Sequence, residues 1–340
     1  MLAPAAWRLV AAVVVATVAI LADDLDPRVR AVLTRYLRFT ATELAELERG
    51  RVVKHGLDAS APGEVAVAGA VKVQVAKAVF LDRLRDIARF KRGPEVLQIG
   101  RFSNPPALSD LDRLTVDQGD FNPRACRVGD CDVRLAADVI RRLPREVDLA
   151  APDAQRRASI WFKQVLLEQV TAYVTGASRM AEYDDGTRAI RPIQEFEGIL
   201  AGSAAIDALA PGLRAHLRDF PAHRVPDAED FLYWSKEKLG SSPFITVTHV
   251  TITCPAATLC VIATKDVYSS RYMDASLAFS IASDVVGSTS ALYLVYVNRS
   301  RANALKGFFS GLRRAIVERR ARASLEENLR QIKIRLESGG

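Results

Sequence analysis

The chain has 340 residues, of which 49% are hydrophobic and 26% are charged, and its formal net charge is +7. This hydrophobic share is that of an ordinary globular protein and excludes a disordered chain, while the length permits one large domain or two smaller ones. No helix-turn-helix, RNP-type strand or zinc-finger spacing accompanies the positive charge, so nothing supports nucleic-acid binding. The mild basic excess suits contact with anionic lipid or envelope polymers, but it is also common where Arg codons are abundant.

Residues 1–22 have the order of a secretory signal peptide. Arg8 precedes a charge-free apolar run from Leu9 to Ala22, and the small residues Ala19 and Ala22 both suit a cleavage site. We therefore expect a periplasmic or secreted protein. An uncleaved N-terminal membrane anchor is the alternative, because counting back past Arg8 just reaches the roughly 20 apolar residues that a spanning helix needs.

The four cysteines form two close couples. Cys126 and Cys131 lie in the loop-like CRVGDC, and Cys254 and Cys260 flank a short turn between two strand-like runs. An even number in an exported protein predicts disulfides, and we expect the local pairing within each couple, with two crossed pairings left open. The spacing lacks a C-x2-C knuckle and no His lies close by, so we expect no metal ion, and no motif indicates a cofactor.

The first third of the chain predicts helices followed by strands. Asp26 with a following proline marks one helix start and Thr40 with Glu43 forms a capping box, so residues 23–60 are predicted to be N-terminal helices. Residues 61–136 form the first part of an α+β domain, with alternating valines from position 65, a helical segment through position 90, and a strand over 96–102.

The middle of the chain predicts a helical insertion over 137–235. Phe162, Leu166, Val170, Tyr173 and Ala177 mark one face of a long amphipathic helix, and at least one more helix falls within 190–217.

Residues 236–340 are predicted to complete the α+β domain. Strands over 244–254, 259–263, 275–281 and 291–297 are spaced as an antiparallel meander, and a long helix over 302–336 follows. A phase slip in the first of these strands indicates a bulge near Thr248 and His249.

The predicted fold class is therefore α+β, with a curved antiparallel sheet packed on a long C-terminal helix and an inserted helical block. This order of elements over 62–104 and 244–336 resembles the START-like helix-grip superfamily. The resemblance implies a cavity between sheet and helix for lipids, sterols or other apolar molecules. Five segments also resemble a family of exported bacterial proteins without known activity: ELAELERG (43–50), VLQIGRFSNPP (96–106), CRVGDCDVRL (126–135), YWSKEK (233–238) and VYVNRSR (295–301).

No nucleophile elbow, H-E-x-x-H, Walker A loop or G-x-G-x-x-G is present, so common hydrolase, metalloprotease and nucleotide-binding signals are missing. His249 is a candidate cavity residue because it sits inside an apolar strand, although the sequence favours a hydrogen-bonded core histidine over this role. The other cavity candidates are Tyr268, Arg271, Tyr272, Asp274 and Trp234, for which structural hydrogen bonding or packing is the alternative.

The leading hypothesis is a periplasmic binding or carrier protein for an apolar or amphipathic small molecule, such as a lipid. An enzyme that uses His249, Tyr268, Tyr272 and Asp274 as an acid–base cluster is one alternative. An envelope protein that contacts anionic membrane is another; its terminal helix carries Arg313, Arg314, Arg319, Arg320 and Arg322.

Overall fold

A computed structural model describes residues 24–177, 182–184, 189–239, 242–302, 305 and 310–339. The predicted signal peptide, residues 1–22, lies outside this described part. Within it, no helix combines the length and the apolar character needed to cross a membrane.

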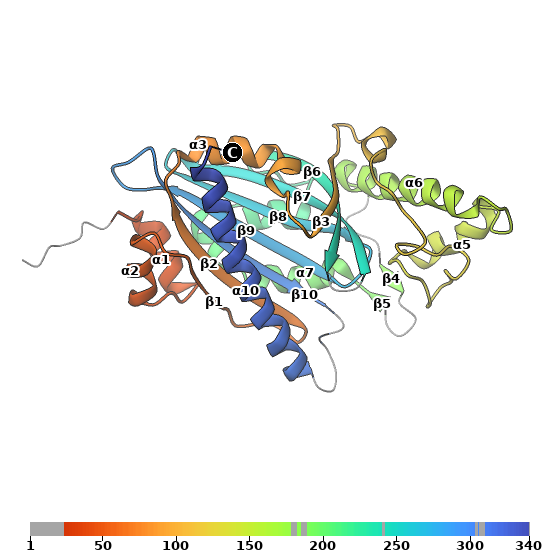
Figure 1. Ribbon diagram of the computed structural model, residues 1–340, viewed down its shortest axis with the longest axis horizontal. Coiled ribbons are helices and arrows are strands. Elements are labelled where there is room, and N and C mark those ends of the chain that lie inside the picture. The colour runs from red at the N-terminus through yellow and green to blue at the C-terminus, as the bar shows by residue number, and fades with distance from the viewer. Residues whose placement is uncertain are drawn as a thin grey trace, which may run out of the picture.

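Eight strands form one open antiparallel sheet, which confirms the predicted α+β class (Figure 1). The strands are β1 (Val53–Gly56), β2 (Glu64–Val73), β3 (Val96–Arg101), β6 (Glu229–Leu239), β7 (Ser242–Ala256), β8 (Leu259–Ser269), β9 (Ala275–Asp284) and β10 (Leu292–Arg301). Their order across the sheet is β1-β2-β10-β9-β8-β7-β6-β3. The last strand of the meander, β10, therefore returns to pair with β2, near the start of the chain.

Side chains alternate between the two faces of the sheet, and both faces are largely covered. We call the face that carries the C-terminal helix α10 (Ser310–Glu337) the inner face, and the opposite one the outer face. Helices α3 (Lys77–Arg85) and α4 (Ile87–Phe90) also lie on the inner side. In Figure 1, α10 and α3 lie on the same face of the sheet and meet at the C-terminal end of α10, where Arg83 donates to the carbonyls of Arg335 and Leu336.

The second half of α10 packs tightly on β2. A Cβ atom at Gly69 would lie 2.8 Å from Leu329 Cδ1 and 3.1 Å from Val53 O, so any side chain there would displace Leu329 of the helix. Leu325, Leu329 and Leu336 are buried there among valines of β2. The predicted packing of a long C-terminal helix against the sheet is therefore confirmed.

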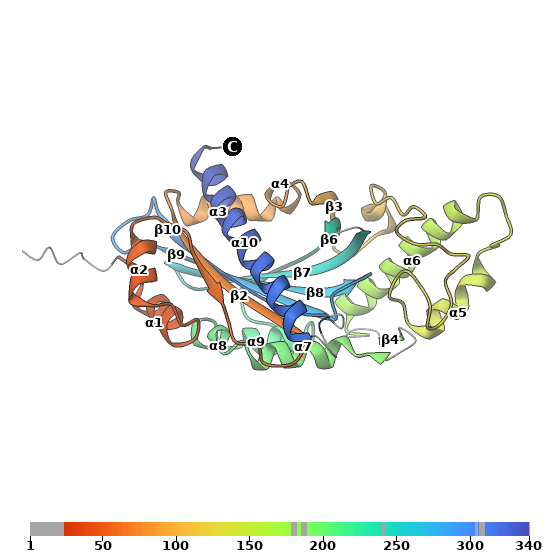
Figure 2. The same cartoon turned by 60° about the horizontal axis from the view of Figure 1, so that its bottom comes forward.

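The remaining helices cover the outer face, as Figure 2 shows. Their apolar side chains form two clusters with the outward residues of β2 and β6–β10. The elements are α1 (Pro27–Arg35), α2 (Ala41–Glu48), η1 (Leu108–Leu111), α5 (Ala137–Glu146), α6 (Ala154–Thr175), β4 (Tyr183–Asp184), β5 (Ala189–Ile190), α7 (Pro192–Ala201), α8 (Ala205–Leu209) and α9 (Leu213–Asp219).

Two element boundaries differ from the sequence prediction. The predicted N-terminal helical segment 23–60 also contains strand β1. The helices of the predicted block 137–235 end with α9, and β6 then crosses the expected boundary. Strand β6 has large apolar side chains on both faces, so its sequence lacks the alternation that marks a half-buried strand.

The predicted bulge lies on the neighbouring strand. Strand β7 pairs with β6 in one unbroken register. Its pairing with β8 shifts by one residue: Val247 pairs with Tyr268 and Thr248 pairs with Asp266, so Val267 of β8 is the extra residue of a bulge. The phase slip in β7 has another cause: its apolar residues switch from the outer to the inner face, because the strand is buried on both sides.

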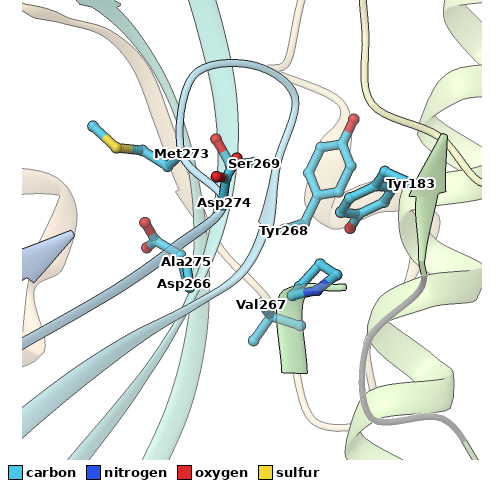
Figure 3. A pocket seen from close by; sticks show the side chains of 9 residues that line it. Tyr183, Asp266, Val267, Tyr268, Ser269, Met273, Asp274 and Ala275 are labelled. Atoms are coloured by element: carbon cyan, nitrogen blue, oxygen red, sulfur yellow. The ribbon is translucent and has the colours of Figure 1, made fainter. Parts of the chain in front are cut away.

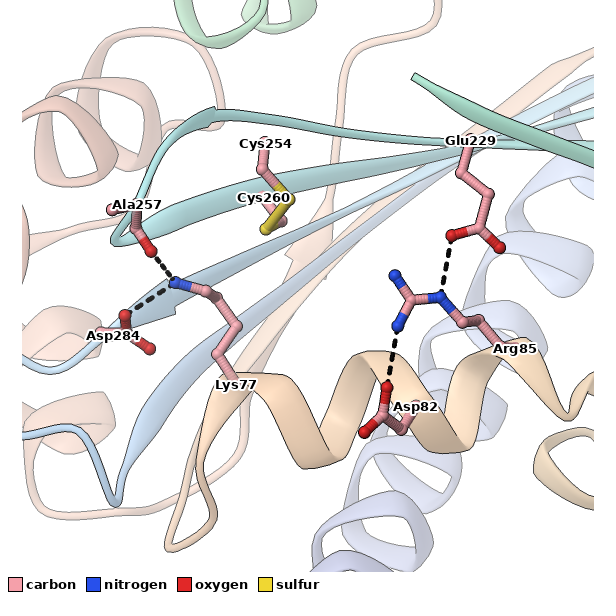
Figure 4. The surroundings of a disulfide bond; sticks show 8 residues. All are labelled: Lys77, Asp82, Arg85, Glu229, Cys254, Ala257, Cys260 and Asp284. Atoms are coloured by element: carbon pink, nitrogen blue, oxygen red, sulfur yellow. Dashed lines mark hydrogen bonds and ion pairs between the residues drawn. A yellow bond between two sulfur atoms is a disulfide. The ribbon is translucent and has the colours of Figure 1, made fainter. Parts of the chain in front are cut away.

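Both predicted disulfides are present in the expected local pairing, Cys126–Cys131 and Cys254–Cys260. The second joins β7 to β8 beside the start of α3 (Figure 4). There the Lys77 ammonium group donates to Asp284 at 2.7 Å and to Ala257 O, and so ties α3 to the end of the sheet. Two disulfides fit an oxidising compartment.

Candidate functional site

His249, the first sequence candidate, lies on the outer face and is fully buried. Its Nε2 lies 2.9 Å from Asp230 Oδ1, and its Nδ1 lies 2.8 Å from the hydroxyl of Tyr173 on α6. His216 of α9 reaches the same Asp230 oxygen through Nε2 at 2.9 Å, and Thr251 donates to it at 2.8 Å. Strand β6, strand β7 and α9 thus bring together residues that are far apart in the sequence.

The two imidazoles and the carboxylate have the composition of a metal site, since their ligand atoms all lie within 4.8 Å of one another. The hydrogen bonds of His216 oppose that use. Its Nδ1 accepts from the backbone N–H of Val225 at 3.1 Å, so in the neutral ring the proton sits on Nε2, facing Asp230. A metal-binding histidine donates its second nitrogen instead.

The arrangement therefore acts as a buried hydrogen-bond network. Hydrogen bonds from His216 and His249 hold the pKa of the Asp230 carboxyl far below its usual range, despite the opposing effect of burial. Burial lowers the pKa of His249 and favours its neutral form. A carboxylate that accepts three hydrogen bonds inside the protein cross-links β6, β7 and α9.

Tyr268 of β8 and Asp274, in the turn between β8 and β9, have different partners. Tyr268 packs on Phe162 and Tyr183 of the outer side, and its buried hydroxyl has no hydrogen-bond partner in the described part of the chain. A cavity of about 10 Å³ borders it, roughly the room for one water molecule (Figure 3). Asp274 pairs with Arg134 at 3.0 Å.

The last three candidates contact neighbouring segments of the chain: Arg271, Tyr272 and Trp234. The Arg271 guanidinium donates to the carbonyls of Gly119 and Asp120, and Tyr272 packs edge-on against Phe244. Trp234 is fully buried and donates from Nε1 to Asp110 O at 2.8 Å, at the junction of the sheet with the segment after β3. Of the six sequence candidates, Tyr268 and Asp274 line the same small cavity, whereas the other four do not border it. The expected acid–base cluster of His249, Tyr268, Tyr272 and Asp274 stays a prediction.

A second polar group lies on the inner face, where the sequence analysis found no candidate. We call it the inner polar cluster; it consists of Lys91, Tyr233, Glu237, Thr248 and Asp266. The Lys91 ammonium group lies 2.7 Å from Glu237 Oε1 and 3.3 Å from the Tyr233 hydroxyl. Thr248 donates to Asp266 Oδ1 at 2.8 Å.

Asp266 is the titratable group of this cluster near neutral pH. Burial raises its pKa to about 6, and the negative charge of Glu237 adds to the effect, while Thr248 and Lys91 oppose it. The pKa of Glu237 is lowered, because the attraction of Lys91 and the hydrogen bonds from Lys91 and Ser235 outweigh burial. Two carboxyl groups on one face therefore differ in protonation: one stays ionised while the other takes up a proton close to pH 6. In Figure 3, the Asp266 side chain lies on the other side of its strand from Tyr183 and Tyr268.

The sheet around this cluster is not fully covered. Besides Asp266 and Asp284, six inner-face residues of the central strands β8, β9 and β10 are partly exposed, although each of these strands is paired on both sides: Thr264, Ser276, Ser280, Tyr296, Asn298 and Ser300. Five of them are uncharged polar residues with short side chains. The inner face is thus apolar beneath α3 and the second half of α10, and polar and open to solvent beside them.

Comparison of the chain with family models, with curated proteins and with solved structures found no match.

Proposed function

We propose that the protein is an exported binding or carrier protein of the helix-grip type, which holds an amphipathic small molecule on the inner face of its sheet. One observation carries the proposal: partly exposed polar side chains in the middle of paired central strands, next to an apolar region under α3 and α10. An apolar tail would lie beside that region, and a polar head would contact Asp266, Tyr233 and Lys91.

The strand order supports the helix-grip assignment. If β1 is set aside as an added edge strand, the first strand β2 is followed by the two helices α3 and α4. Strands β3 and β6 to β10 come next and α10 ends the chain, while the last strand β10 pairs back to β2. This is the order that the sequence resemblance implies. The tight packing of α10 on Gly69 restricts ligand space to the open part of the inner face.

The test uses the oxidised protein after periplasmic expression. Organic extraction followed by mass spectrometry should release a lipid-like molecule at close to one equivalent. Ser280→Trp places a bulky side chain in the open part of the inner face and should remove this molecule, whereas Val286→Trp, at an exposed turn position, should retain it. Thermal unfolding checks that both variants fold. Equal ligand content in the two variants, or no ligand in the wild type, would contradict the proposal.

A membrane contact through the first half of α10 is the second candidate. Ile316 and Val317 are 37% and 38% exposed, and Arg313, Arg319 and Arg320 are exposed beside them. Positions 313, 316, 317 and 320 share one side of a helix, so this side combines apolar and cationic groups. Arg314 and Arg322 are partly buried, and Arg322 lies 4.0 Å from Glu318, so they contribute less.

Cosedimentation with vesicles containing phosphatidylglycerol tests this contact. Binding should fall with added salt and with Arg319→Gln/Arg320→Gln, and it should be unaffected by Arg113→Gln, which removes an exposed charge elsewhere. Binding that survives loss of the two α10 charges would exclude this surface.

A further inference from the structure

A separate cavity lies on the outer face, between the C-terminal end of α1 and the turn from α7 to α8. Its volume is about 170 Å³. Residues 35–38 and 202–205 form its walls, and Phe279, Val297 and Arg299 of β9 and β10 contribute from the sheet. The sheet separates it from the inner polar cluster, so it is independent of the proposed function.

The buried apolar residues of the lining are Leu37, Ala205, Phe279 and Val297. A dry cavity of about 150 Å³ is known to hold benzene in another protein. The present cavity therefore has room for a molecule about one ring in size.

Arg299 places a cationic group against this apolar lining. It is 8% exposed, and its Nη1 donates to Glu64 Oε1 at 2.6 Å and to Asp58 O at 3.1 Å. Its Nε and Nη2 have no acceptor among the described residues, and neither atom is sealed from solvent. Two donors of a nine-tenths buried guanidinium group are thus left for a ligand.

A glycine makes room for this guanidinium group. A Cβ atom at Gly202 would lie 3.1 Å from Arg299 Nη1 and 3.0 Å from Ser60 Cβ, so any side chain there would displace the arginine or the loop.

Two more arginines from the end of α1 line the cavity. Arg38 has a positive φ of 57° and pairs with Asp58 at 2.6 Å, and Arg35 has no hydrogen-bond or ion-pair partner in the described part of the chain. Asp58 and Glu64 neutralise two of the three guanidinium groups, which leaves one uncompensated positive charge at Arg35.

We propose that this cavity binds a small monocarboxylate whose apolar part is about one ring in size. The carboxylate accepts hydrogen bonds from the free donors of Arg299 and is neutralised by Arg35, while the ring contacts Leu37, Phe279 and Val297. A carboxylate fits better than a neutral acceptor because its two oxygens can accept from both free nitrogen atoms of Arg299 in charge-assisted hydrogen bonds, and its negative charge offsets that of Arg35.

Benzoate is the probe, and benzyl alcohol is its neutral counterpart of similar size. Calorimetric titration of the oxidised full chain should give binding of benzoate at least about tenfold tighter than that of benzyl alcohol, as expected for hydrogen bonds between charged groups. Arg35→Gln should weaken benzoate binding about tenfold and leave benzyl alcohol binding unchanged. Arg113→Gln, also exposed and without a described partner, should change neither.

Ala205→Leu, which fills the cavity from α8, should abolish binding of both molecules while thermal unfolding confirms the fold. Ser280→Trp on the inner face should leave benzoate binding intact, so failure of the proposed function and failure of this site are distinguishable. Equal affinity for the two probes, insensitivity to Arg35→Gln, or absence of benzoate binding at millimolar concentration would overturn the proposal. Inorganic phosphate that competes as well as benzoate would overturn the assignment to a monocarboxylate.

Discussion

Two aspartates on opposite faces of the sheet should respond in opposite directions to the same substitution. Asp230 on the outer face accepts hydrogen bonds from His216, His249 and Thr251, and its pKa is held far below its usual range. Asp266 on the inner face accepts one from Thr248, and burial raises its pKa to about 6. Replacing each with asparagine keeps the shape and removes the charge.

The expected magnitudes follow from these contacts. Asp230→Asn should lower the free energy of unfolding by about 3 kcal/mol at pH 8, because hydrogen bonds to a buried charged acceptor contribute roughly 1.5–3 kcal/mol each and are not additive. For Asp266, a pKa about two units above the unfolded value corresponds to at most about 3 kcal/mol of destabilisation by the ionised form. Partial solvent contact reduces this, so Asp266→Asn should raise the free energy of unfolding by about 1–2 kcal/mol at pH 8.

The pH dependence separates the two sites further. The folded pKa of Asp266 is raised, so the ionised form is disfavoured and its cost disappears as the pH falls below about 6; wild type and Asp266→Asn should be equally stable near pH 4. The folded pKa of Asp230 is lowered, so its stabilisation is complete above about pH 4 and is lost only in stronger acid.

Urea unfolding of the oxidised protein at pH 4, 6 and 8, followed by circular dichroism, measures all of these differences. The reasoning would be refuted if both substitutions shifted stability in the same direction at pH 8. An Asp266→Asn effect that persisted at pH 4 would also refute it, because the carboxyl group is then protonated.

Three further predictions concern metal binding by the buried hydrogen-bond network around Asp230, the two disulfides, and the packing of α10 on β2. Because Val225 N–H occupies Nδ1 of His216, added Zn²⁺ should leave the melting temperature of the oxidised protein within about 1 °C of that with a chelator; a rise of several degrees would show metal binding. Replacing either cysteine couple by two alanines should lower the free energy of unfolding by about 2 kcal/mol, since the bridges span only 5 and 6 residues; urea midpoints check this, and a loss above about 4 kcal/mol would indicate another role. Gly69→Ala should lower the free energy of unfolding by about 1–3 kcal/mol and reduce the hydrogen-exchange protection of α10, because the added Cβ atom forces Leu329 and α10 away from β2. Gly287→Ala is the control: its Cβ atom meets open space, and although its φ is positive, α10 should stay protected from hydrogen exchange.

Local patterns in the sequence predicted the local structure well. Each cysteine couple shares one turn, so spacing favoured the local pairing that the structure has, although it left two crossed pairings open. The capping box of Thr40 and Glu43 forms as expected, because all of its atoms lie within one helical turn.

The sites depend on contacts between distant segments, which spacing cannot reveal. His249 is a candidate from the sequence because it sits inside an apolar strand, yet its hydrogen-bond partners Tyr173 and Asp230 lie 76 and 19 residues away. Lys91 and Glu237 are separated by 146 residues. A polar residue inside a strand signals that a partner exists, but only the sheet register identifies it.

The helical block between β3 and β6 is compatible with the proposed helix-grip arrangement because of the face on which it packs. Its residues join the outer-face clusters with Leu232, Val247 and Tyr268, whereas α3, α4 and α10 occupy the inner face. Strands β3 and β6 are neighbours in the sheet, so an insertion between them need not cross any other strand. The insertion therefore thickens the outer side, supplies Tyr173 and His216 to the buried network, and leaves the open part of the inner face uncovered.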